Sequence, residues 1–143
     1  MPKLLLFAPC EKVLVDEASK AISLIVILQE VHYKLPPGTT LPPNAAIPMN
    51  WSVISLWQQE QPADFGVEFE QRLVVENSAG ATVMANESKW TFAADRNHRI
   101  VANVPVIPLG SRKLTLKLLY RVAGSRDWLP AAEFPIELHQ DAL

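Results

Sequence analysis

The sequence predicts an all-β protein: a two-sheet, mostly antiparallel β-sandwich of about eight strands with immunoglobulin-like architecture. Short runs of alternating apolar and polar residues support this prediction, because a period of two places every second side chain on one face of a strand. In the clearest run, Leu114, Leu116 and Leu118 share one face and the residues between them are polar. Residues that favour turns separate the runs, as they do in sandwiches and barrels.

The length and composition of the chain indicate one domain, 1–143. A chain of 143 residues buries a substantial core without disulfides or a metal ion. The formal net charge of -2 provides no general attraction to phosphate backbones or anionic membranes, so we expect neither a nucleic acid nor a membrane as partner. The single cysteine, Cys10, rules out an internal disulfide, and its apolar surroundings predict a small buried residue.

The sequence also predicts a cytoplasmic protein of bacterial or phage origin. The apolar run at 4–8 is shorter than the roughly 7–15 apolar residues of a signal peptide. No stretch approaches the ~18 consecutive apolar residues that a membrane-spanning helix requires.

The first two expected strands are 3–15 and 21–33, joined by a polar turn at 16–20. Pro9 has no N–H to donate to a ladder, so the first strand is expected to bend or bulge there. The second segment is rich in β-branched residues, which favours a strand. A buried helix over the same residues remains an alternative.

A proline-rich connection follows at 35–48 and contains five of the twelve prolines of the chain. Fixed φ angles and missing backbone donors predict an extended segment. A connection of this length without its own secondary structure is typical of functional loops or of crossings between sheets. Its apolar residues Leu35, Leu41 and Ile47 offer cover for part of an exposed sheet face.

The middle of the chain predicts three strands, at 50–59, 67–76 and 81–93. Trp51 and Trp57 share one face of the first, and Phe69 and Leu73 share one face of the second. Between the second and third, Asn77-Ser78-Ala79-Gly80 is a hairpin signal.

The C-terminal part predicts three more strands, at 98–109, 113–122 and around 134–138. Pro105 and Pro108 indicate that the first of these is an edge strand or contains a bulge. Glycine-containing turns at 110–112 and 124–127 separate the three strands.

No pattern in the sequence indicates catalysis, a cofactor or a metal ion. The histidines His32, His98 and His139 are far apart, and none has a partner at the spacing of a metal-binding motif. No local signature pairs Cys10 with a histidine as nucleophile and base. We therefore expect a protein that is not an enzyme and has no catalytic, cofactor-binding or metal-binding residues.

Two tryptophans are candidates for contact with a small ligand. Trp128 follows the 124–127 turn, and Trp51 lies in a strand whose alternation also suits core packing. Aromatic side chains form binding platforms for flat or apolar ligands. A ligand-binding sandwich with the 35–48 connection as its lid is the alternative functional prediction.

Strands that are apolar on both faces predict self-association. A strand in a two-layer sandwich buries one face and exposes polar residues on the other, but 3–15, 21–33 and 98–109 break this rule. The candidate interface residues are Leu5, Phe7, Ile25, Ile27 and Val31. The favoured prediction is a non-catalytic interaction or assembly module that forms a homodimer or binds another protein. A monomer whose apolar face is covered by the proline-rich connection is the alternative.

The N-terminal hairpin also carries a family resemblance. Residues 10–16 and 20–25, followed by a proline-containing connection, resemble the opening of a family of uncharacterised bacterial and phage proteins. The 110–120 strand and Phe134-Pro135-Ile136 fit the same pattern, so the resemblance spans most of the chain. It implies a β-sandwich and assigns no activity, ligand or catalytic residue.

Overall fold

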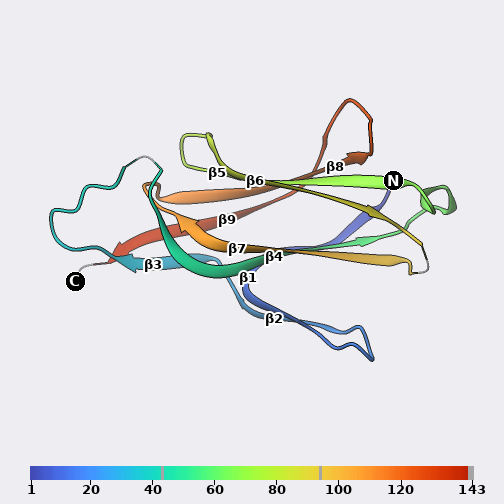
Figure 1. Cartoon of the computed structure of the whole chain (residues 1–143), viewed down its shortest axis with the longest axis horizontal. Helices are drawn as coiled ribbons and strands as arrows, with labels where there is room; N and C mark the ends of the chain where they lie inside the picture. The colour runs from blue at the N-terminus through green and yellow to red at the C-terminus, as the bar shows by residue number, and fades with distance from the viewer. Residues whose placement is uncertain (43, 94, 142–143) are drawn as a thin grey trace.

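The computed structural model describes residues 1–42, 44–93 and 95–141 and shows an all-β protein. The described residues form two facing layers of strands (Figure 1). The strands are β1 (Lys3–Val15), β2 (Ile22–Ile27), β3 (Glu30–Lys34), β4 (Ala46–Gln58), β5 (Glu68–Glu76), β6 (Thr82–Thr91), β7 (Asn97–Pro108), β8 (Lys113–Val122) and β9 (Leu129–Asp141). A short 3₁₀ turn, η1 (Pro62–Asp64), lies between β4 and β5. Within the described ranges, no helix is long and apolar enough to cross a lipid bilayer.

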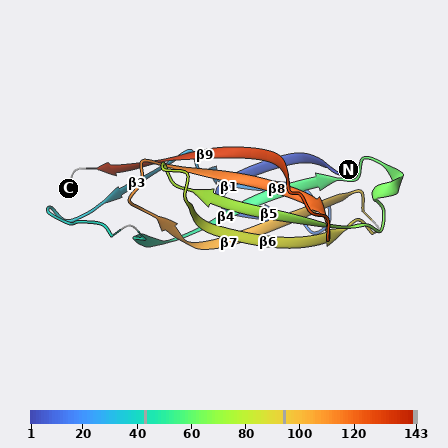
Figure 2. The ribbon, with the colours of Figure 1, turned by 90° about the horizontal axis from the view of Figure 1, so that it is seen from above.

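The arrangement of the strands confirms the predicted two-sheet, mostly antiparallel β-sandwich. One sheet has the order β2-β1-β4-β7, and the other has the order β3-β9-β8-β5-β6. The pairing of β3 with β9 is parallel, and the other pairings between these strands are antiparallel. Seen from above, the strands of both layers run along the long axis of the molecule (Figure 2), which is the aligned packing of two twisted sheets.

The segment 21–33 is two strands in different sheets, and the helix alternative is wrong. The chain leaves the first sheet after β2 and joins β9 in the second sheet as β3. At the crossing, the Leu28 N–H donates to the Pro9 carbonyl at 3.0 Å, and the Gln29 carbonyl accepts from Glu137 N–H at 2.9 Å. Val26 has a φ of 54°, a left-handed conformation that interrupts the alternation of side chains. The described residues therefore form nine strands rather than the expected eight.

Strand β1 changes its partner at Cys10. Residues 3–10 pair with β4, whereas residues 10–15 pair with β2. The second half of β1 and β2 form a hairpin, here called the hairpin arm (residues 11–27), that leaves the two layers (Figure 1). The ladder with β4 keeps its register at Pro9, where a bend or bulge was expected, and its shift in register lies between Leu4 and Leu6. Cys10 is fully buried as predicted, and burial raises the pKa of its thiol.

The core lies between the sheets, where the predicted alternation is clearest on β8. Leu114, Leu116 and Leu118 are at most 1% exposed. Buried hydrogen bonds also cross the core between the sheets. Ser55 Oγ and Trp57 Nε1 on β4 both donate to Gln71 Oε1 on β5, at 2.7 and 2.9 Å. These two hydrogen bonds link one sheet directly to the other.

The proline-rich connection is shorter than predicted, because β4 begins at Ala46 and residues 46–48 pair with β7. Leu41 and Ile47 pack against the core cluster, and Ile47 does so as part of β4. Pro43 lies outside the described residues. Strand β7, which contains Pro105 and Pro108, is an edge strand as predicted.

Candidate functional site

The hairpin arm exposes four large apolar side chains close together in the fold, here called the hairpin surface. They are Leu14, Ile25, Val26 and Ile27, which are 43%, 39%, 55% and 47% exposed. Ile25 pairs with Lys12 and Ile27 with Cys10, so these residues follow one short ladder. Exposed apolar residues gathered on one element are a common mark of an interaction surface.

The backbone of the hairpin arm strengthens this interpretation. Strand β2 is at the edge of its sheet and pairs with β1 on one side. Its sequence, ISLIVI, contains neither a charged residue nor a proline. Natural edge strands usually carry such residues to prevent pairing with another chain. The edge of β2 is therefore suited to the addition of a further strand.

The structure brings together only two of the five candidate interface residues. Ile25 and Ile27 lie on the hairpin surface. Leu5 is 42% exposed but lies in the half of β1 that pairs with β4. Phe7 is partly buried against the core and Val31 is buried in it, so neither lies on the hairpin surface, and the assignment of Val31 to an interface is wrong.

Sequence reasoning missed Leu14 and Val26 on the hairpin surface. Strict alternation assigns Val26 to the same face as Leu28, but the left-handed backbone at Val26 turns its side chain outward while Leu28 is buried. Leu14 pairs with Ser23 in the part of the arm that lies beyond the sheet. Alternation carries no signal for the exposure of Leu14, because it does not show where β1 stops pairing with β4.

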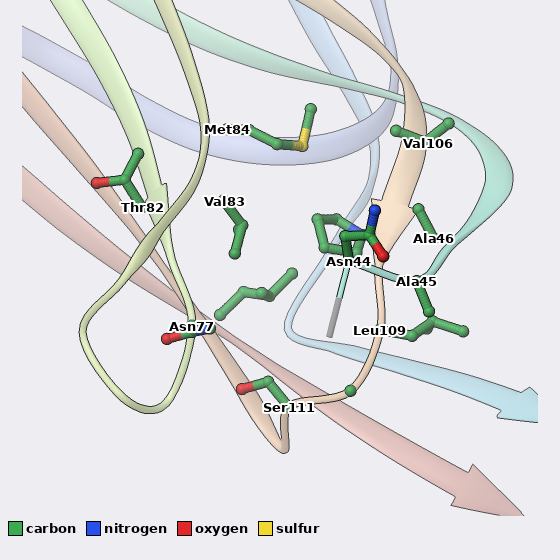
Figure 3. Close-up of a pocket in the computed structure, with 13 residues that line it drawn as sticks. Asn44, Ala45, Ala46, Asn77, Thr82, Val83, Met84, Val106, Leu109 and Ser111 are labelled. Carbon is green, nitrogen blue, oxygen red and sulfur yellow. The ribbon is translucent and has the colours of Figure 1, made fainter. Parts of the chain in front are cut away.

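A second feature is a cleft of about 330 Å³ between the edge strands β6 and β7. Val83 and Met84 on β6 face Val106 on β7 across it (Figure 3). Asn77 and Ser111 lie at its rim (Figure 3). The described lining contains neither an aromatic nor a charged side chain.

Trp51 is a core residue, so its assignment as a ligand aromatic is wrong. It is 1% exposed, and its indole N–H donates to the Val106 carbonyl at 2.8 Å. The alternation of β4 places it inward with Val53 and Trp57, which are also buried. A tryptophan satisfied in this way presents no free face to a ligand.

Trp128 is half-buried on the second sheet beneath two arginines. The guanidinium groups of Arg72 and Arg121 lie 4.4 and 4.0 Å from its ring centre. Arg72 Nε also donates to Glu87 at 2.8 Å, and Arg121 Nε donates to Glu70 at 2.6 Å. These ion pairs hold the guanidinium groups over the indole. The ring of Trp128 is therefore covered by side chains of the same chain.

We expect Trp128→Ala to lower the free energy of unfolding by about 1–2 kcal/mol, because cation–π contacts at exposed sites contribute about 0.5–1 kcal/mol each. Urea denaturation measures the change, and Trp128→Phe serves as the control because it retains an aromatic face. A Trp128→Ala variant as stable as the parent chain would show that the two arginines do not hold the ring.

The histidines are not all isolated, contrary to the sequence prediction. His32 on β3 and His139 on β9 stack with ring centres 4.9 Å apart. His98 lies apart from them on β7, stacked on Trp90 at 6.2 Å. Burial lowers the pKa of His98, and the nearby Arg99 lowers it further.

Comparison of the chain with models of known protein families finds no match, and no curated protein matches its sequence.

Proposed function

We propose that the protein is a non-catalytic interaction module that forms a homodimer through its hairpin arm. The exposed, uncharged edge strand β2 carries this proposal. Apolar surface and unpaired backbone groups occur together there. Another strand that adds to the sheet buries the apolar surface and forms hydrogen bonds with the backbone groups. We place the module in the cytoplasm, because an unpaired cysteine such as Cys10 is typical of reducing compartments.

A second copy of the chain fits this edge better than a charged partner. In a two-fold pairing, the same surface of each copy forms the interface. Antiparallel β2 strands then place uncharged, mainly apolar residues opposite one another along residues 22–25, the part of β2 that precedes the left-handed Val26. A partner strand rich in acidic or basic residues finds no opposite charge on β2 itself and loses its own hydration.

We also propose that the sandwich is immunoglobulin-like. In such domains strands A, B and E share one sheet, and strands C, F and G share the other, with C′ beside C in variable-type domains. In chain order, β1, β4 and β7 match A, B and E, while β5, β6, β8 and β9 match C, C′, F and G. This order of strands supports the assignment.

The alternative of a small-ligand site has less support. The cleft between β6 and β7 is lined by Asn44, Ala45 and Ala46 of the 35–48 segment. Neither Trp51 nor Trp128 lines it, and its described lining holds no charged group to orient a ligand. The hairpin surface is therefore the stronger candidate for function.

Sedimentation at micromolar concentration tests the homodimer. We expect the parent chain to sediment at twice 15.9 kDa and the double variant Ile25→Lys, Ile27→Lys to sediment as a monomer. Lysine is compatible with an exposed strand, but two such charges on each copy repel and hydrate the edge. Circular dichroism of the double variant establishes that it is folded.

Leu129→Lys is the matched control, because Leu129 is 42% exposed and lies on β9 in the other sheet. We expect this variant to remain a dimer. A parent chain that is monomeric at micromolar concentration contradicts the proposal. A dimer that survives the double substitution contradicts the assignment of the interface to β2.

A further inference from the structure

The parallel pairing of β3 with β9 aligns two similar tripeptides. Glu30 is opposite Glu137, Val31 opposite Leu138, and His32 opposite His139. Val31 and Leu138 are buried. Because side chains alternate along a strand, the two glutamates and two histidines project together from the other face of the sheet.

The ring nitrogens of both histidines converge on carboxylate oxygens. His32 Nε2 is 3.3 Å from Glu30 Oε2, and His139 Nε2 is 4.0 Å from Glu30 Oε1. His139 Nε2 is also 3.2 Å from Glu137 Oε2. One donor atom from each of Glu30, His32 and His139 lies within 4.8 Å of the others. In a tetrahedral zinc site with bonds of about 2.1 Å, neighbouring donor atoms are about 3.4 Å apart.

Asp141 orients one of these histidines for binding. Both of its carboxylate oxygens are 3.1 Å from His32 Nδ1. An ionised carboxylate only accepts hydrogen bonds, so Nδ1 carries the proton and Nε2 is directed toward Glu30. A carboxylate bound to the far nitrogen of a metal-ligating histidine is the usual outer-shell arrangement, which fixes the ring and increases its basicity.

The charges around the pair favour a cation at this position. Asp141 lies beside Nδ1 of His32 and Glu30 lies beside its Nε2. Glu137 lies beside Nε2 of His139. A cation bound between the two rings is therefore close to negative charge.

We propose that Glu30, His32 and His139 bind a divalent transition-metal ion of the zinc class. Two imidazoles and one carboxylate are a donor set that suits Zn²⁺. The ion would join β3 to β9. Because β3 is an edge strand held by β9 alone among the described strands, this link clamps the edge of the second sheet.

Zinc titration of the untagged, metal-stripped chain tests the site. We expect equilibrium dialysis to show one Zn²⁺ bound per chain. His32→Gln and His139→Gln remove a ligand each and are expected to weaken binding at least about 10-fold, and Asp141→Asn about 10-fold or more through the outer shell. Nitrogen NMR of the imidazoles is expected to shift for His32 and His139 on addition of zinc.

His98→Gln and Glu133→Gln are the matched controls, because His98 lies on the other sheet and Glu133 lies farther along β9. Both are expected to bind zinc as the parent chain does. Absence of stoichiometric zinc binding by the parent chain overturns the proposal. Zinc binding by the His32→Gln and His139→Gln variants that is as strong as that of the parent chain overturns it as well. Circular dichroism identifies any variant that is unfolded. If His32→Gln is unfolded, Glu30→Gln is the substitute, and its binding decides in the same way.

Discussion

Replacing Gln71 with leucine is expected to lower the free energy of unfolding by about 2–6 kcal/mol. Gln71 is 4% exposed, and its side-chain oxygen accepts hydrogen bonds from both Ser55 and Trp57. Leucine fills a similar volume but accepts no hydrogen bond, so two buried donors lose their partner at about 1–3 kcal/mol each. Chemical denaturation followed by tryptophan fluorescence measures the loss.

Two further variants separate the hydrogen bonds from the change in packing. Gln140→Leu replaces an exposed glutamine on β9 and is expected to change stability by less than about 0.5 kcal/mol. Adding Ser55→Ala to Gln71→Leu removes one of the two orphaned donors and is expected to restore part of the stability. A loss below about 1 kcal/mol for Gln71→Leu would show that this polar group does not join the sheets.

Leu28→Ala is expected to lower the free energy of unfolding by about 2–5 kcal/mol, because it leaves a cavity where the chain passes from one sheet to the other. Leu28 is 4% exposed and belongs to the main core cluster. The loss of this anchor also weakens the attachment of β3 to β9. We therefore expect faster amide hydrogen exchange in Glu30–Lys34.

Leu129→Ala is the matched control for Leu28→Ala, since Leu129 is also a leucine and is 42% exposed on β9, away from the hairpin surface. We expect it to cost less than about 1 kcal/mol. Both variants need the same protein concentration, because self-association stabilises the folded state by mass action. Equal losses in the two variants would contradict the burial of Leu28 at the crossing.

The positions of most strands were predictable because alternation and turn chemistry are local. The 113–122 run became β8 with the same bounds, and its leucines are buried as expected. The turn at Asn77–Gly80 was predictable for the same reason. Asn77 Oδ1 accepts hydrogen bonds from the N–H groups of Ala79 and Ala81, and Gly80 adopts a φ of 80°.

The division of 21–33 was not predictable from the same pattern. Alternation shows which residues share a face of a strand, but it does not show which sheet the strand joins. The sequence shows that Val31 is apolar. It belongs to the core only because β3 joins the second sheet. The crossing at Leu28 and the left-handed backbone at Val26 also decided which apolar residues form the hairpin surface.

The sequence by itself determined the fold class, the two-residue alternation of the strands and the absence of an internal disulfide. The tertiary structure decided which exposed residues meet. Glu30-Val31-His32 and Glu137-Leu138-His139 share a pattern in the sequence. The two tripeptides are adjacent only because β3 and β9 pair in parallel and in register. That register follows from the burial of Val31 and Leu138 between the sheets, because a shift of β3 by one residue along β9 would move Val31 from the core to solvent.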